Sequence, residues 1–130
     1  MAERSGTPHF PGKAPLDAYG NGGFRFADMS HRGSILCLPS GIWAWPPSHA
    51  GEIDAAGLQR AMNEAREIEI FLIGTGEEHV PLLPEIRGAL RAAGLSVDIM
   101  ATGPAARTYN ILLGDQRKVG AALIAVENIR

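Results

Sequence analysis

Two glycine-containing loops hold the side chains of this sequence that are best suited to bind a ligand. Gly74-Thr75-Gly76 and Ala101-Thr102-Gly103-Pro104 each follow an apolar run that predicts a strand. Because open α/β sheets bind ligands outside the carboxyl ends of their parallel strands, both loops should face one crevice. Arg107 falls in the first turn of a helix predicted from about Ala105, beside free backbone amides that favour an anion. The sequence therefore predicts a site for an anionic small molecule, and its candidate residues are Gly74, Thr75, Gly76, Thr102, Arg107, Tyr109 and Asn110.

The same loops also have a purely structural interpretation. Gly74-Thr75-Gly76 permits a sharp turn, and Arg107 would then only pair with Glu77 or Glu78. The loop does not match the dinucleotide-binding pattern G-x-G-x-x-G, because His79 stands where the third glycine is required. Glu77 and Glu78 would also repel a pyrophosphate. Both the ligand-binding and the structural interpretation stay open at this point.

A second candidate surface is aromatic. Trp43 and Trp45 lie two residues apart, so they share one face of the strand predicted there. Such a pair either fills the core or forms an exposed patch for a protein partner. Pro46-Pro47 follows directly and would hold the patch rigid. We keep both possibilities and take Trp43 and Trp45 as candidate partner-binding residues.

Catalytic and metal-binding patterns are weak in this sequence. The histidines lack the H-x-x-x-H spacing of a zinc site, and no G-x-S-x-G elbow is present. Cys37 is the single cysteine, and its apolar neighbours predict a buried thiol whose raised pKa makes it unreactive. We expect no cofactor and no bound metal, leave catalytic residues unassigned, and favour a non-catalytic role over an enzyme.

Hydrophobic periodicity divides the chain into two unlike halves. Short runs bounded by Gly, Pro and Ser predict antiparallel strands over residues 19–46. From Asp54 onward the pattern reads helix, strand, helix, strand, helix, strand, which is βαβαβ-like and indicates a parallel or mixed sheet. Pro84 and Gly94 mark the two ends of the second helix. The fold class predicted from this order is α/β.

Length and charge narrow the class of protein. The chain has 130 residues, of which 45% are hydrophobic, and a formal net charge of −2. We predict a flexible tail over residues 1–17 and a single α/β domain over residues 18–130. Arginines and lysines are scattered, which argues against binding to nucleic acid or to a membrane surface. No apolar run approaches the ~18 residues of a transmembrane helix, and we expect a cytoplasmic protein without an export signal.

Four blocks of sequence occur in a characteristic order. They are Gly33 to Gly41 followed by Trp45-Pro46, Phe71 to Gly76, Leu83 to Arg87, and Ala105 to Leu112. Together they resemble a family of small, mostly uncharacterised bacterial and archaeal domains that includes a mitochondrial assembly factor for respiratory complex I, the NADH:ubiquinone oxidoreductase. The resemblance covers about Gly23–Val126 and implies a three-layer β/β/α domain with a mixed central sheet. Members often carry Cys where this chain has Ala106, which argues against thiol chemistry at that position.

These observations leave three functional hypotheses. The resemblance implies a non-catalytic protein-binding domain that assists assembly of a respiratory or membrane complex, with respiratory subunits as partners by analogy. The alternative is an anion-binding protein or unassigned enzyme with its crevice at Thr75, Thr102 and Arg107. A third is a homo-oligomer that uses residues 34–45 or a sheet edge. Because nothing at the amino terminus resembles a mitochondrial targeting segment, we favour the bacterial cytoplasm over the mitochondrion.

Overall fold

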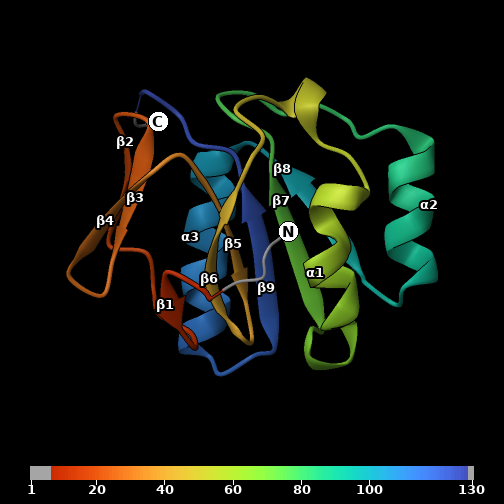
Figure 1. Ribbon diagram of the computed structural model, residues 1–130, viewed down its shortest axis with the longest axis horizontal. Coiled ribbons are helices and arrows are strands. Elements are labelled where there is room, and N and C mark those ends of the chain that lie inside the picture. Colours follow the sequence, from red (N-terminus) through yellow and green to blue (C-terminus); the bar gives the residue numbers. More distant parts are fainter. Residues whose placement is uncertain (1–6, 129–130) are drawn as a thin grey trace.

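Two sheets organise the molecule, and the structure, a computed structural model, describes residues 7–128 (Figure 1). The strands are β1 (Phe10–Pro11), β2 (Ala18–Gly20), β3 (Gly23–Phe26), β4 (Met29–Arg32), β5 (Ser34–Leu38), β6 (Gly41–Trp45), β7 (Ile70–Gly74), β8 (Val97–Met100) and β9 (Val119–Leu123). A six-stranded sheet has the order β1-β6-β5-β9-β7-β8, and a smaller sheet has the order β2-β3-β4. The predicted antiparallel strands of the first half are confirmed, because β2 pairs with β3, β3 with β4, and β5 with β6, each pair antiparallel.

Helical crossovers build the second half of the chain. The helices are α1 (Gln59–Asn63), α2 (Pro84–Ala92) and α3 (Thr102–Gly114), and the 3-10 turns are η1 (Ala50–Glu52), η2 (Ala56–Leu58) and η3 (Ala65–Glu67). β7 lies parallel to both β8 and β9, and β9 lies antiparallel to β5, so the central sheet is mixed as predicted. Pro84 begins α2, and Gly94 follows it with φ +98°. In the described part of the chain, no helix is long and apolar enough to cross a membrane.

Side chains that alternate along the central strands fill two separate cores. Phe71 and Ile73 on β7 face α1 and α2, in a core that also contains Trp45. Leu72 faces the other way, toward α3 and the three-stranded sheet, in a core that includes Tyr109. Both faces of β7 are therefore covered, which explains its uninterrupted apolar sequence. The predicted three-layer β/β/α architecture is confirmed.

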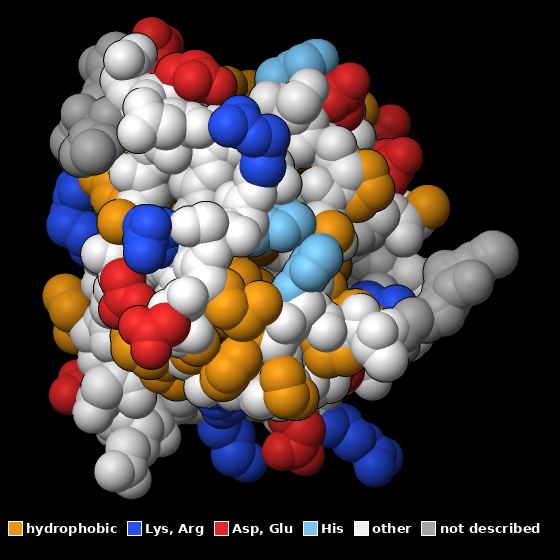
Figure 2. Space-filling model, turned by 60° about the vertical axis from the view of Figure 1, so that its left-hand side comes forward, with side chains coloured by type: hydrophobic (Ala, Val, Ile, Leu, Met, Phe, Trp, Pro, Cys, Tyr) orange, Lys and Arg blue, Asp and Glu red, His pale blue; other side chains and the backbone are white. Residues whose placement is uncertain are grey.

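The first described residues are fastened to the domain. Asn110 accepts a hydrogen bond from the Leu16 amide and donates one to the Leu16 carbonyl, both at 2.8 Å, and Leu16 is buried. The rings of His9 and His31 lie 4.6 Å apart. In the view of Figure 2, two adjacent histidine side chains lie beside a group of hydrophobic side chains. Residues 1–6 of the predicted tail lie outside the described residues, and the division of the chain at residue 17 stays a prediction.

The start of α3 differs from the sequence prediction. We expected the helix from about Ala105, but it begins at Thr102. Proline is tolerated in the first turn of a helix because its missing amide would have no intrahelical partner there, so Pro104 does not delay the start. Arg107 consequently lies in the second turn, away from the unpaired amides of the first.

Substitution by alanine at two glycines of this fold should change the stability in opposite directions. A Cβ at Gly74 would lie 2.9 Å from the Thr102 Cα and 2.9 Å from a Leu123 methyl, whereas a Cβ at Gly88 in α2 would meet nothing within 4 Å. Gly74→Ala should lower the free energy of unfolding by about 1–3 kcal/mol through overpacking. Gly88→Ala should raise it by about 0.5–1 kcal/mol, because alanine favours a helix interior. Urea denaturation measures both, and changes of the same sign would contradict the packing described here.

Candidate functional site

The loops at the carboxyl ends of β7 and β8 meet, as the sequence predicts. The Thr75 amide donates to the Met100 carbonyl at 2.9 Å, and the Thr102 amide donates to the Gly76 carbonyl at 2.8 Å. Gly74, Thr75, Gly76 and Thr102 are all buried at this junction. The absence of a Cβ at Gly74 is what lets α3 approach β7 so closely. The structure therefore brings four of the seven predicted site residues together.

The hydroxyl of Thr102 connects three segments of the chain. Its Oγ1 accepts from the Gly76 amide at 3.0 Å and donates to the Ile124 carbonyl at 2.7 Å. The residue has no exposed surface. Both partners of this hydroxyl are backbone groups, so it connects α3 to the loop after β7 and to the segment after β9.

The hydroxyl of Thr75 holds its own loop in shape. Its Oγ1 donates to the Glu78 carbonyl at 2.6 Å and accepts from the Val80 amide at 3.0 Å. Thr75 is 4% exposed. Like Thr102, it uses its hydrogen-bonding capacity on the backbone, so a ligand would have to displace one of these bonds.

The other three predicted site residues point to different partners. Arg107 is exposed and donates to the Tyr19 hydroxyl at 3.0 Å. Tyr109 is buried against the Cys37 thiol, and burial is the main cause that raises the pKa of both groups, that of Cys37 to about 12. Asn110 binds the Leu16 backbone. The expectation that Cys37 is buried is confirmed, and its low reactivity stays a prediction that the raised pKa supports.

Little space remains at the predicted crevice. A cavity of about 20 Å³ lies there, with Tyr19, Gly76, Glu77 and Pro104 among its lining residues. This volume accommodates about one water molecule. The Glu77 carboxylate accepts from the backbone amides of Glu127 and Asn128, each at 3.1 Å, which holds residues 127–128 across this region. Binding of an anionic ligand by these residues stays a prediction, and it requires the loops to open.

The two tryptophans have separate environments, and both contribute to the core on the side of α1 and α2. Trp45 is 3% exposed, and its indole N–H donates to the Gly57 carbonyl at 3.1 Å. Trp43 is half-buried beneath Arg60, whose guanidinium carbon lies 3.5 Å from the ring centroid. Core filling is therefore the interpretation that the structure supports for Trp45. Little of its surface is open to a partner, and the role of Trp43 and Trp45 in partner binding stays a prediction.

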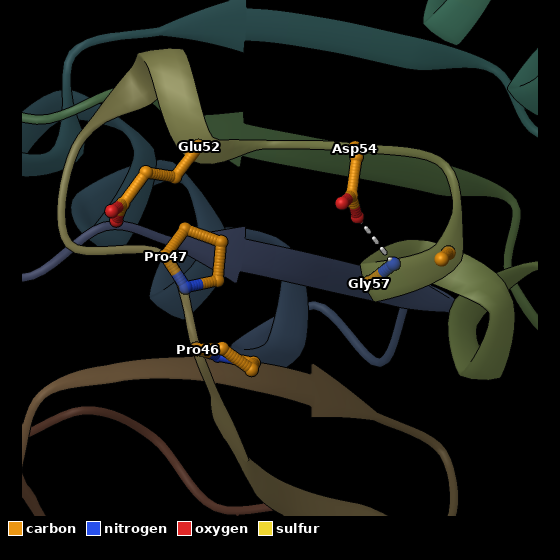
Figure 3. Close-up of a pocket in the computed structure, with 6 residues that line it drawn as sticks. Pro46, Pro47, Glu52, Asp54 and Gly57 are labelled. Atoms are coloured by element: carbon orange, nitrogen blue, oxygen red, sulfur yellow. Dashed lines mark hydrogen bonds between the residues drawn. The ribbon is translucent and has the colours of Figure 1, made fainter.

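A hollow of about 470 Å³ opens directly after the tryptophan strand. Pro46, Pro47, Glu52, Asp54, Ala56 and Gly57 line it, and we call it the Pro46–Gly57 groove. Figure 3 shows the two prolines on one side and Asp54 with Gly57 on the other. Sequence analysis did not find this groove, because its walls come from the end of β6 and from the η1–η2 connection. The one signal for it was the rigid Pro46-Pro47 pair.

Three hydrogen bonds, one of them buried, fix the two walls of the Pro46–Gly57 groove. On one side, the buried Ser34 hydroxyl donates to the Pro47 carbonyl at 2.6 Å. On the other, the Gly57 carbonyl accepts from Trp45, and the Gly57 amide donates to the Asp54 carboxylate at 2.7 Å. Proline φ angles are fixed as well. The groove is therefore preorganised, which lowers the entropic cost of binding a partner.

The Pro46–Gly57 groove carries negative charge. Two hydrogen bonds from Ser48, one from its amide and one from its hydroxyl, hold the pKa of the exposed Glu52 carboxyl below its usual range. Asp54 adds a second exposed carboxyl group. A proline wall beside carboxylates suits the aliphatic stem and charged head of a lysine or arginine. Within residues 7–128, no group of three or more His, Cys, Asp or Glu side chains could hold a metal ion.

Comparison with known proteins identifies a family and several relatives of this chain. A family model described as "Protein of unknown function (DUF498/DUF598)" matches residues 16–124. An uncharacterised protein of Rhodobacter capsulatus is 39% identical over 124 residues, which cover 95% of this chain and 93% of that protein. The crystal structure of an outer membrane protein from Bartonella henselae is 52% identical, has a TM-score of 0.88, and is matched over 92% of this chain and 100% of that chain.

Another relative has an assembly role in its name. The NADH dehydrogenase (ubiquinone) 1 alpha subcomplex assembly factor 3 of Mus musculus is 30% identical over 115 residues. The match covers 88% of this chain but 62% of the mouse protein. This chain thus spans somewhat less than two thirds of that relative's length.

The Thr102 hydroxyl gives a test of whether the loop junction is structural. Thr102→Val should lower the free energy of unfolding by about 2–3 kcal/mol, because the Gly76 amide and the Ile124 carbonyl lose their buried partner. Thr102→Ser should cost less, since it keeps the hydroxyl. Thr108→Val is the matched control, because within residues 7–128 the one side-chain contact of the Thr108 hydroxyl is a long one, 3.9 Å to the Met100 sulfur. Equal effects of Thr102→Val and Thr108→Val in urea denaturation would contradict this role.

Proposed function

The chain belongs to the DUF498/DUF598 family, and we propose that it is a non-catalytic protein-binding domain that assists assembly of a respiratory or other membrane complex. The printed name of the mouse relative, an assembly factor for NADH dehydrogenase, supports this proposal. Because the match covers 62% of that relative, its partners are transferred here only as part of the proposal. The location proposed for this chain is the bacterial cytoplasm.

The observation that carries the proposal is the Pro46–Gly57 groove. It has about 470 Å³ of open volume, and its walls are held by bonds to Ser34 and Trp45 from beneath. Preorganised concave surfaces with an apolar wall and a few polar groups are typical binding sites. We assign the groove, rather than the tryptophans themselves, to contact with the partner. Trp45 then acts as a positioning residue through the Gly57 carbonyl.

The chemistry of the groove indicates which part of a partner would enter it. Glu52 and Asp54 present carboxylates at its rim, and Pro46 presents an exposed apolar ring. A basic segment would gain charge complementarity together with apolar contact. Charged rims mainly affect the association rate and its salt dependence, so binding should weaken as ionic strength rises.

The loop junction at Thr75 and Thr102 also supports a binding role over a reaction. The Thr102 hydroxyl already hydrogen-bonds to two backbone groups and the Thr75 hydroxyl to three. A hydroxyl that acts as a nucleophile needs a neighbouring base and a path to its substrate. Among the residues that the structure describes, neither hydroxyl has a side-chain base as a hydrogen-bond partner, and the adjoining cavity is about 20 Å³.

The test is recovery of respiratory subunits by the tagged full-length chain from its own bacterium, quantified by mass spectrometry. Ala56→Trp should fill the groove and reduce recovery on the order of tenfold, because Ala56 is exposed on the groove lining. Gln59→Trp is the matched control, since Gln59 is exposed in α1 outside the groove. Failure to recover any respiratory subunit, or equal recovery with Ala56→Trp, would contradict the proposal.

A charge-neutral variant tests the role of the carboxylates separately. Glu52→Gln combined with Asp54→Asn keeps the acceptor oxygens that bind Ser48 and Gly57 but removes both charges. Recovery by this variant should fall and should depend less on salt than recovery by the wild type. An unchanged salt dependence would rule out a basic segment as the occupant.

A further inference from the structure

The strand β8 forms one edge of the six-stranded sheet. Its neighbour on one side is β7, and within residues 7–128 no strand pairs with its other side. The Ser96 carbonyl accepts from the Phe71 amide of β7 at 2.8 Å, and the Met100 carbonyl accepts from the amide of Thr75, the residue after β7, at 2.9 Å. Because alternate residues of a strand direct their backbone groups to the same neighbour, Val97 and Ile99 direct theirs to the open edge. Such an edge is a template for an added strand.

Two arginines of α2 lie beside this edge. Arg87 and Arg91 are four residues apart, so they share one face of the helix. Both line a hollow of about 200 Å³ together with Ser96, Val97 and Ile99. Both also line a second hollow of about 340 Å³ that runs along α2 past Gly88.

The charge of these arginines is not neutralised locally. Arg87 and Arg91 are exposed, and in the described part of the chain neither guanidinium forms an ion pair with a carboxylate. The only acidic residue of β8 is Asp98. Since side chains alternate along a strand, Asp98 projects from the face opposite to that of Val97 and Ile99, which pack in the core on the α2 side. The α2 side of the edge is therefore basic and the other side is acidic.

From this arrangement we propose that the open edge of β8 binds an extended acidic segment of a partner protein as an added strand. Backbone hydrogen bonds to Val97 and Ile99 supply affinity, and carboxylates at alternate positions lie against Arg87 and Arg91. Asp98 disfavours acidic side chains at the intervening positions. The inference rests on the proposed function as a protein-binding domain, but it concerns a different surface from the Pro46–Gly57 groove.

A second copy of this chain fits the edge less well. Two-fold pairing of two β8 edges would bring the Arg87 and Arg91 pairs of both copies toward each other on one face of the joined sheet. Like charges placed together in an interface are repulsive. An acidic segment has the opposite charge at the same place, so it is the occupant that the charges favour.

The test uses the full-length chain labelled with ¹⁵N and a blocked peptide in which glutamate and valine alternate over eight positions. We expect amide chemical-shift changes at residues 97–100 and slower hydrogen exchange of the Val97 and Ile99 amides. Arg87→Glu/Arg91→Glu should weaken binding about tenfold or more. Arg66→Glu/Lys118→Glu is the control, because it makes the same change in net charge at exposed positions elsewhere. Equal weakening by both double variants would overturn the proposal, as would no binding at millimolar peptide.

Modified peptides separate strand addition from simple charge attraction. Methylating either all glutamate amides or all valine amides blocks one side of the peptide backbone, so one of these two peptides should bind and the other should not. Binding retained in both, or lost in both, contradicts an added strand. A lysine–valine peptide that binds as tightly as the glutamate peptide also overturns the proposal. These assays contain no respiratory subunit, so their failure leaves recovery through the Pro46–Gly57 groove as a separate result.

Discussion

Two buried hydroxyl groups, those of Thr102 and Ser34, connect the layers of this protein through hydrogen bonds to the backbone. The Thr102 hydroxyl binds the Gly76 amide and the Ile124 carbonyl, which joins α3 to β7 and to the segment after β9. One residue further on, the Ala125 amide donates to the Ser34 hydroxyl at 2.9 Å, and that hydroxyl donates to the Pro47 carbonyl. Buried polar groups are costly unless every bond is made. The segment after β9 is thereby held between the Thr102 and Ser34 hydroxyls. The Ser34 hydroxyl also fixes the Pro47 wall of the Pro46–Gly57 groove.

This constraint changes which residues we associate with function. Thr75 and Thr102 lie where an α/β sheet usually binds a ligand, yet their hydroxyls bond to the backbone. The open surfaces lie instead near the two edges of the central sheet, at the groove that follows β6 and along β8. The first is negative and the second carries the positive charge of α2. A domain with two surfaces of opposite charge can contact two different segments, which is what the proposed assembly role requires.

The sequence predicted well what depends on neighbouring residues. The strand β7, the ends of α2 at Pro84 and Gly94, and the burial of Cys37 follow from local pattern, and the family resemblance supplied the three layers. Local sequence pattern could not show that the Thr102 hydroxyl bonds to the Ile124 carbonyl, or that Asn110 binds Leu16, 94 positions away. Side-chain partners that are distant in the chain leave no periodic signal. The predicted start of α3 was wrong for a local reason, since Thr102-Gly103-Pro104 was assigned to the preceding loop, whereas proline is accommodated in the first turn of a helix.

Site-specific photo-crosslinking from position 56 shows whether the Pro46–Gly57 groove contacts a protein partner. A photoreactive phenylalanine analogue placed at Ala56 in living cells reports what lies in the groove without purification. We expect adducts with respiratory-complex subunits from position 56 and few or none from the same analogue at Gln59. No adduct from position 56, or the same adducts from both positions, would contradict it.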